Sequence, residues 1–187
     1  MEIFLIRHTS VDINKEICYG FSDVKLADNY KEDFKKLKKK LKPINPSIVY
    51  SSPLIRCSML ADYLSDTNYI KDNRLKELNF GDWEMKNWYE IEQDELDKWI
   101  KEFVNYRCPE GETFVELFER AKEFYQEIIT KDFEKVYIIT HGGVIRSIVA
   151  LILEIPLKNA PSIQIDFGSI SKISINKEVV NLSYLNK

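Results

Sequence analysis

Two short apolar runs constrain the fold of this chain more than any other feature of its sequence. Residues 2–6 read EIFLI, and residues 135–140 read KVYIIT. A nearly continuous apolar run of this length is typical of a strand that is covered on both faces, as in a parallel sheet with helices on either side. The two runs therefore predict the central strands of a three-layer α/β/α fold.

Local patterns predict the elements around these strands. Residues 29–42 have apolar side chains at helical spacing, with Lys35 to Lys40 as the solvated face of a helix. Ser52 and Pro53 predict the N-cap and first-turn proline of a helix that runs to about Leu64. The other predicted elements are strands at 47–50 and near 74–77, helices at 88–104, 114–128 and 142–154, and closing strands near 163–175 and 179–185. Together these elements predict a mostly parallel, mixed central sheet.

Length and charge limit the classes of protein to consider. The chain has 187 residues, which we interpret as a single domain over 1–187 with a helical insertion around 88–130. Its 27 lysines and arginines against 30 aspartates and glutamates give a net charge of −3. No global basic field therefore draws it to nucleic acid or to anionic lipid, and any bound anion must be captured locally.

The sequence also lacks signals for export, a membrane or a structural metal. No apolar run approaches the roughly 20 residues that cross a bilayer, and strand-like residues begin directly after Met1. We therefore expect a cytoplasmic protein with no membrane partner. Cys18, Cys57 and Cys108 are widely spaced and form no CxxC pair, which favours reduced thiols over disulfides or a zinc site. The sequence leaves the oligomeric state open.

The chain has two histidines, and each directly follows one of the apolar runs. His8 comes after residues 2–6 and Arg7, and His141 comes after residues 135–140. In a parallel sheet, ligands bind beyond the carboxyl ends of the strands, where the following loops diverge. If the two strands are neighbours, both imidazoles meet there. Two unrelated loop histidines are the alternative, but the repeated placement argues against it.

Groups that can hold a phosphoryl group surround these histidines. Arg7 precedes His8, and Asn14 follows it. Arg56 falls near the first turn of a helix, where a cation is disfavoured by the helix dipole unless an anion shares that end. Gly142 and Gly143 open another helix and can offer bare amide donors to a phosphate, or they can simply form the turn between strand and helix.

Four motifs occur in a characteristic order along the chain. They are Leu5-Ile6-Arg7-His8 followed by Asn14, residues 51–56 (SSPLIR), residues 77–84 (ELNFGDWE) and residues 140–146 (THGGVIR). This set resembles the histidine phosphatase superfamily, whose fold is called phosphoglycerate mutase-like. The resemblance implies that fold, and it implies a phosphomonoester hydrolase.

The resemblance also implies a role for each matching residue. His8 is implied as the nucleophile that forms a phosphohistidine, and Arg7, Arg56 and His141 as the groups that bind the phosphoryl oxygens. Asn14 assists them, and Glu77 takes the position of the proton donor, with Glu84 as its nearest rival. The implied chemistry agrees with general principles, because phosphoryl transfer depends on positioning and charge stabilisation, and forked guanidinium donors match the phosphoryl oxygens. It requires no metal and no cofactor.

Two further segments bear on the substrate. Residues 17–26 (ICYGFSDVKL) and 109–114 (PEGETF) resemble the alpha-ribazole phosphatases of cobalamin nucleotide-loop assembly. This resemblance implies alpha-ribazole 5'-phosphate as the small-molecule substrate, with Gly20, Phe21 and Gly142 in substrate or phosphate binding. The short stretch between Glu77 and His141 favours a phosphatase over a mutase.

Several alternatives stay open. One is a broad-specificity phosphatase of sugar phosphates or nucleotides, and another is a non-catalytic phosphate-binding module. Thr9, Ser10 and Met85 depart from the common family pattern, and Thr9 adds a Cβ where the family often has glycine. The departures therefore leave the exact substrate open. Trp83, Trp88 and Tyr89 are either pocket residues or core aromatics.

Overall fold

One mixed β-sheet organises the computed structural model, which describes residues 1–41, 48–65, 68–177 and 179–187. Within these residues the sheet has six strands in the order β3-β2-β4-β1-β5-β6. The first four strands in the chain are mutually parallel, and the last two form the antiparallel edge. The strands are β1 (Glu2–Arg7), β2 (Ile48–Ser51), β3 (Ile70–Lys71), β4 (Lys135–Thr140), β5 (Ile170–Asn176) and β6 (Val179–Tyr184).

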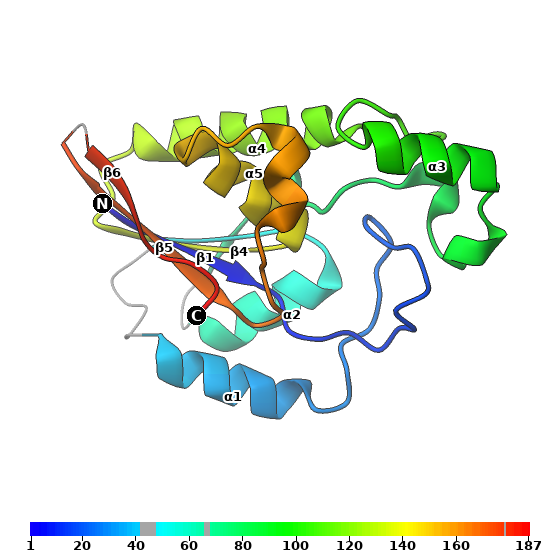
Figure 1. Ribbon diagram of the computed structural model, residues 1–187. Coiled ribbons are helices and arrows are strands. Elements are labelled where there is room, and N and C mark those ends of the chain that lie inside the picture. Colours follow the sequence, from blue (N-terminus) through cyan, green and yellow to red (C-terminus); the bar gives the residue numbers. More distant parts are fainter. Residues whose placement is uncertain (42–47, 66–67, 178) are drawn as a thin grey trace.

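Helices cover both faces of this sheet. In Figure 1, α1 (Tyr30–Lys40) and α2 (Ile55–Leu64) lie on one side, and α4 (Phe114–Ile129) and α5 (Gly142–Ile152) lie on the other. A further helix, α3 (Gln93–Glu102), lies beyond the end of the sheet. Short 3₁₀ turns complete the fold at Asn73–Leu75, Gly81–Trp83, Trp88–Glu90 and Leu157–Ser162. The predicted three-layer, phosphoglycerate mutase-like α/β architecture is confirmed.

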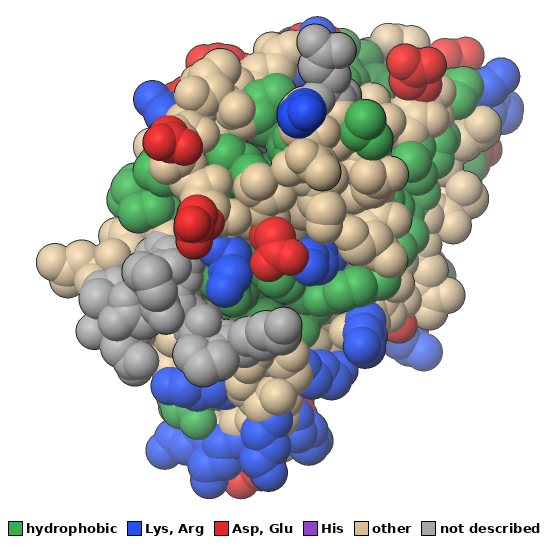
Figure 2. Space-filling model, turned by 90° about the vertical axis from the view of Figure 1, so that its left-hand side faces the viewer, with side chains coloured by type: hydrophobic (Ala, Val, Ile, Leu, Met, Phe, Trp, Pro, Cys, Tyr) green, Lys and Arg blue, Asp and Glu red, His purple; other side chains and the backbone are tan. Residues whose placement is uncertain are grey.

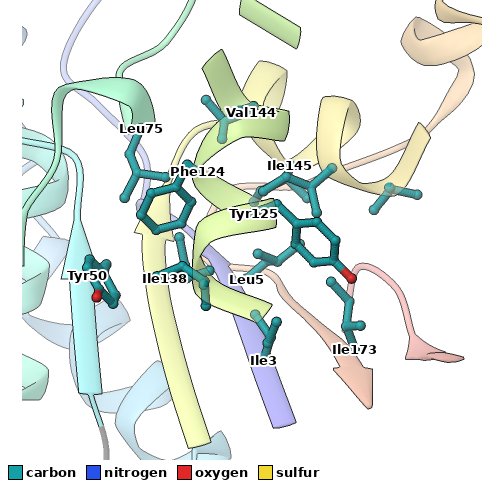
Figure 3. Packing of buried hydrophobic residues seen from close by; sticks show 14 of the residues in the cluster. Ile3, Leu5, Tyr50, Leu75, Phe124, Tyr125, Ile138, Val144, Ile145 and Ile173 are labelled. Carbon is teal, nitrogen blue, oxygen red and sulfur yellow. The ribbon is translucent and has the colours of Figure 1, made fainter. Parts of the chain in front are cut away.

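The central strand β1 shows why the apolar runs are nearly continuous. Alternate side chains of a strand point to opposite faces of the sheet. Ile3 and Leu5 pack into the core under α4 and α5, whereas Phe4 and Ile6 pack into the core above α1 and α2. All four are buried, so each position needs an apolar residue. Figure 3 shows the first of these cores, where Phe124 of α4 points toward the sheet.

The register of the central strands places the two histidines side by side. β1 pairs with β4 in parallel, and the last pair in the register is Arg7 with Thr140. The residue that follows each strand is a histidine, so both imidazoles lie next to each other at the carboxyl ends of the parallel strands. The backbone N–H of His8 also donates to the Thr140 carbonyl at 3.1 Å. The neighbouring strands that the sequence required are therefore present.

Several predicted elements differ from the structure in detail. The helix expected at 88–104 is a 3₁₀ turn at Trp88–Glu90 followed by α3, and the strand expected near 163–175 begins only at Ile170. The strand expected near 74–77 is instead a 3₁₀ turn, because the Asp72 side chain accepts from the Arg74 N–H and closes the chain into a turn. Ser52 is not the N-cap of α2, since the residue before the helix is Leu54 and the helix begins at Ile55. The predicted ends at residue 42 and Ser47 lie outside the described residues.

The stretch of chain between β3 and α4 forms a small hydrophobic core of its own, which Cys18 joins. Cys18, Trp83, Ile91 and Cys108 are buried together, and Trp99 of α3 packs against them. By contrast, α4 packs on α5 and contributes to the main core. The helical insertion around 88–130 stays a prediction, and the two helices within that range pack in different places.

The outer surface of α1 is basic. Its exposed side chains include Lys31, Lys35, Lys36, Lys39 and Lys40, as the sequence predicted for a solvated face. Figure 2 shows lysine and arginine side chains gathered at the lower end of the molecule, where α1 lies. Across the described ranges, the longest apolar helical segments are too short to span a bilayer.

Candidate active site

A cavity of about 380 Å³ lies at the carboxyl ends of β1 and β4, and four of the five predicted catalytic residues line it. One part of its wall is charged and polar, and another part is aromatic and apolar. The charged part comes from Arg7, His8, Arg56, Glu77 and Arg146. The charged part of the wall thus brings together residues from four separate stretches of the chain.

His8 is held in one tautomer by its own loop. It is 2% exposed, and its Nδ1 lies 2.7 Å from the carbonyl oxygen of Thr9. Because a carbonyl oxygen can only accept, Nδ1 must carry the hydrogen, which leaves the lone pair on Nε2. Burial, and then the charges of Arg56 and Arg7, hold the pKa of His8 well below its usual value. A neutral imidazole with a free Nε2 is the form that can attack phosphorus.

His141 lies directly against His8. Their ring centroids are 5.1 Å apart, and the rings meet edge to face. The His141 ring is fully buried, and its Nε2 lies 2.8 Å from the hydroxyl oxygen of Ser52. Ser52 therefore orients a site histidine instead of capping a helix. Burial, followed by the charges of Arg56, His8 and Arg7, keeps the pKa of His141 well below its usual value.

The guanidinium groups of Arg7 and Arg56 lie against backbone carbonyl groups and aromatic rings. Among the described residues, no salt bridge joins Arg7, Arg56 or Arg146 to an acidic side chain. Arg56 is fully buried and donates to the carbonyl oxygens of Gly20 and Ser22. Arg7 donates to a backbone carbonyl at 2.6 Å, and its guanidinium carbon lies 3.8 Å from the centre of the Phe167 ring. Unpaired guanidinium groups at a cavity are suited to a phosphoryl anion.

Glu77 faces the start of α5. Its carboxylate accepts from the Gly143 N–H at 3.1 and 3.2 Å and from the Leu78 N–H at 3.1 Å. A Cβ at position 143 would lie 2.2 Å from Glu77 Oε1. The glycine therefore makes room for this carboxylate, and in the structure its N–H donates to Glu77. Gly142 lies against the Arg7 and Arg146 side chains.

The segment that carries Glu77 is braced from behind. Arg120 of α4 donates to the carbonyl oxygens of Arg74, Lys76 and Glu77 at 2.6 to 2.7 Å. Its guanidinium is itself paired with the carboxylate of Glu112. Three hydrogen bonds from one side chain thus fix the backbone that carries Glu77.

Three predicted binding residues have other contacts in the structure. Asn14 is exposed, accepts from the Glu16 N–H and does not line the cavity. The N–H groups of Gly20 and Phe21 point to the carboxylate of Glu84. The role of these three residues in substrate binding stays a prediction.

The aromatic wall of the cavity was not predicted from the sequence. It consists of Tyr19, Leu78, Phe80, Trp99, Phe103, Phe114 and Pro161. Phe103 and Phe114 contact each other with ring centroids 5.1 Å apart. Phe114 falls on the apolar face of the predicted helix at 114–128, and helical spacing is the same for a residue that lines a cavity as for one in the core. Of the aromatics singled out earlier, Trp83 is buried in the core and Tyr89 is 82% exposed.

Arg146 was also missed, although it belongs to the motif at 140–146. It lies one helical turn beyond Gly142, lines the cavity and donates from Nε to the Ile163 carbonyl at 2.9 Å. In the described part of the chain, no cluster of three or more histidine, cysteine or acidic side chains is arranged to hold a metal ion.

Comparisons with known proteins agree on one family. The sequence model described as histidine phosphatase superfamily (branch 1) matches residues 3–187. A Hydrogenobacter thermophilus protein provisionally named phosphoserine phosphatase 2 is 30% identical, over 99% of this chain and 95% of that protein. The adenosylcobalamin/alpha-ribazole phosphatase of Escherichia coli is 24% identical, over 100% of this chain and 96% of that protein. The solved alpha-ribazole phosphatase from Shigella flexneri superposes with a TM-score of 0.92 at 25% identity, covering 100% of this chain and 96% of that one.

The depressed pKa of His8 predicts a pH-dependent stability. In the unfolded chain His8 takes up a proton near pH 6.5, whereas in the folded protein it stays neutral to much lower pH. The unfolded state therefore binds more protons below pH 6.5, and the folded state loses stability as the pH falls. We expect His8→Asn, which cannot titrate, to reduce the slope of unfolding free energy against pH by about 1.4 kcal/mol per pH unit below this point. Urea unfolding from pH 7 downward measures both slopes, and identical slopes would contradict the assignment.

Proposed function

We propose that this chain, which belongs to the histidine phosphatase superfamily and is a phosphatase of that family, hydrolyses phosphomonoesters through a phosphohistidine formed on Nε2 of His8. One observation carries this proposal. The hydrogen bond from His8 Nδ1 to the Thr9 carbonyl leaves the Nε2 lone pair free in a cavity that holds unpaired guanidinium groups. A nucleophile and positive charge for the phosphoryl oxygens therefore meet in one place.

The first half-reaction forms the phosphoenzyme. Arg7 and Arg56 bind the phosphoryl oxygens and stabilise the charge that spreads over them in the transition state. As the bond between His8 Nε2 and phosphorus forms, the bond from phosphorus to the ester oxygen breaks, and its electron pair stays on the leaving oxygen. Glu77 donates the proton that this alkoxide needs.

The second half-reaction releases phosphate. A water molecule gives a proton to the Glu77 carboxylate and attacks phosphorus, the phosphorus–nitrogen bond breaks, and its electron pair returns to His8. Splitting hydrolysis into two displacements replaces one difficult step with two easier ones. His141, whose ring touches His8, assists in holding the phosphoryl group throughout.

We further propose alpha-ribazole 5'-phosphate as the substrate. Its leaving group carries a benzimidazole base, which is flat, aromatic and largely apolar. The wall formed by Phe80, Trp99, Phe103 and Phe114 offers rings against which such a base can stack, beside the charged end that takes the phosphate. The resemblance to named alpha-ribazole phosphatases supports the same substrate.

One observation favours a second candidate, a phosphomonoester that also carries a carboxylate, such as phosphoserine. Arg146 adds a third guanidinium to the cavity, and Arg7 and Arg56 suffice for one phosphoryl group. A carboxylate on the leaving group would give Arg146 a charged partner. The relative at 30% identity has phosphoserine in its name.

The covalent intermediate is directly testable. Rapid mixing with p-nitrophenyl phosphate followed by an alkaline quench should trap one phosphoryl group on the peptide that contains His8, because phosphohistidine survives alkali. His8→Asn, which keeps the size of the side chain, should lose both the trapped phosphoryl group and turnover. Turnover that persists in His8→Asn would refute the phosphohistidine mechanism.

The role of Glu77 predicts a dependence on the leaving group. Glu77→Gln should slow the phosphorylation step by about 10²- to 10⁴-fold for an alkyl ester such as glycerol 2-phosphate, whose alkoxide needs a proton. With p-nitrophenyl phosphate, whose phenolate leaves unaided, the burst of nitrophenol should persist and the phosphoenzyme should accumulate, because water is no longer activated. Rapid-quench kinetics measures both steps. An equal loss on the two substrates would exclude Glu77 as the proton donor.

The substrate proposal predicts a ranking and its cause. The kcat/KM for alpha-ribazole 5'-phosphate should exceed those for phosphoserine and glucose 6-phosphate. Trp99→Ala should lower it by about tenfold while changing phosphoserine turnover by less than about twofold, because only the aromatic base contacts this ring. A preference for phosphoserine that Arg146→Gln removes would favour the second candidate. Equal values for all three esters would indicate a broad-specificity phosphatase.

A further inference from the structure

Glu84 gathers four backbone N–H groups around one carboxylate. Its Oε2 accepts from Gly20 at 3.0 Å and from Ser22 at 2.9 Å, and its Oε1 accepts from Phe21 at 2.8 Å and from Phe80 at 3.0 Å. Three of these donors are consecutive residues of the loop that follows His8. Both oxygens are occupied by the protein, so Glu84 has no hydrogen-bonding direction left for a substrate.

The same loop contacts Arg56 on its other side. Its carbonyl groups at Gly20 and Ser22 accept from Arg56 Nη2 and Nη1, the second of these at 2.8 Å. The loop therefore lies between a carboxylate that accepts hydrogen bonds from its N–H groups and a guanidinium that donates hydrogen bonds to its carbonyl groups. Gly20 is required here for space, since a Cβ would lie 1.7 Å from the carbonyl oxygen of Leu78.

One peptide group makes both contacts at once. The peptide that joins Gly20 to Phe21 donates its N–H to Glu84 Oε1 and offers its carbonyl oxygen to Arg56 Nη2. Its dipole, about 3.5 D, is thus aligned between the negative and the positive side chain. This one peptide group thus connects the Glu84 carboxylate to the Arg56 guanidinium through two hydrogen bonds.

From this arrangement we propose that Glu84 is a positioning residue, which orients the Arg56 guanidinium toward the phosphoryl group by fixing the carbonyl groups of residues 20–22. The inference rests on the proposed role of Arg56 in phosphoryl binding. It assigns Glu84 a task other than the proton donation for which it rivals Glu77.

The chemistry of the contact requires a carboxylate at position 84. Four converging donors need an acceptor with several lone pairs and no hydrogen of its own, and only an ionised carboxylate provides both. A glutamine would place its NH₂ group against two of the loop N–H groups. Burial alone would raise the pKa of Glu84, but the hydrogen bonds from Ser22, Gly20 and Phe21 outweigh it and lower this pKa below its usual value.

The test is a double-mutant cycle on phosphate binding. Inorganic phosphate is titrated calorimetrically into the wild type, Glu84→Gln, Arg56→Lys and the double variant, and kcat/KM for p-nitrophenyl phosphate is measured alongside. We expect Glu84→Gln to weaken phosphate binding about tenfold in the wild-type background. In the Arg56→Lys background the same substitution should have less than about a twofold effect, because the guanidinium that Glu84 positions is then absent. The full tenfold loss in both backgrounds would overturn the proposal.

Matched variants separate positioning from general damage. Glu116 also accepts a backbone N–H, at the start of α4, and lies outside the cavity. Glu116→Gln should therefore lower stability to urea without changing phosphate affinity. If Glu84→Gln does not fold, Glu84→Asp keeps the charge at a shorter reach, and an intermediate loss that depends on Arg56 is expected. Unchanged phosphate affinity in a folded Glu84→Asp variant would overturn the proposal.

Failure of this inference and failure of the proposed function give different results. If the wild type releases no phosphate from any ester, the phosphomonoesterase mechanism fails, yet the binding cycle can still support the coupling of Glu84 to Arg56. If the wild type is active and the two substitutions act independently on phosphate affinity, only the positioning role fails.

Discussion

The burial of an unpaired guanidinium is the constraint on which this site depends. Arg56 is fully buried, and the described residues that contact its charge are two backbone carbonyl groups and the ring of Tyr19. A buried charge is costly unless the protein solvates it, and a carboxylate would solvate it at the expense of the phosphate. Carbonyl dipoles stabilise the cation without neutralising it. The positive charge therefore stays available to an anion, and it also keeps His8 neutral.

Two hydrogen-bonded backbone segments hold Arg56 and Glu77 in place. On one side the loop at 20–22 is held by Glu84 and holds Arg56, and on the other the segment at 74–77 is held by Arg120 and carries Glu77. In both cases a side chain outside the reaction satisfies several backbone groups at once. Catalytic groups placed on braced backbone lose less entropy when they align, which suits a reaction that depends on positioning.

The cavity separates chemistry from selectivity. The histidines and arginines that we propose to act on phosphorus come from the ends of β1 and β4 and from the first turn of α2, which packs on the sheet. Most of the aromatic wall, namely Leu78, Phe80, Trp99, Phe103 and Phe114, belongs to two smaller hydrophobic clusters that are separate from the two cores of the sheet. Substitutions in that wall can change the leaving group without moving the phosphoryl site.

Local sequence by itself determined the central strands, most of the helices, and the meeting of His8 with His141, because strand periodicity and residue order are properties of adjacent residues. The family motifs added Arg7, Arg56 and Glu77 to the same site. Tertiary structure alone decided the contacts of Ser52, Gly143, Glu84, Arg120 and Trp99. Each of these residues acts on a partner far away in the chain, and the periodicity around Trp99 is the same for a core residue as for a cavity wall. Hydrogen bonds between loops leave no periodic trace in a single sequence, so such contacts appear only when the chain is folded.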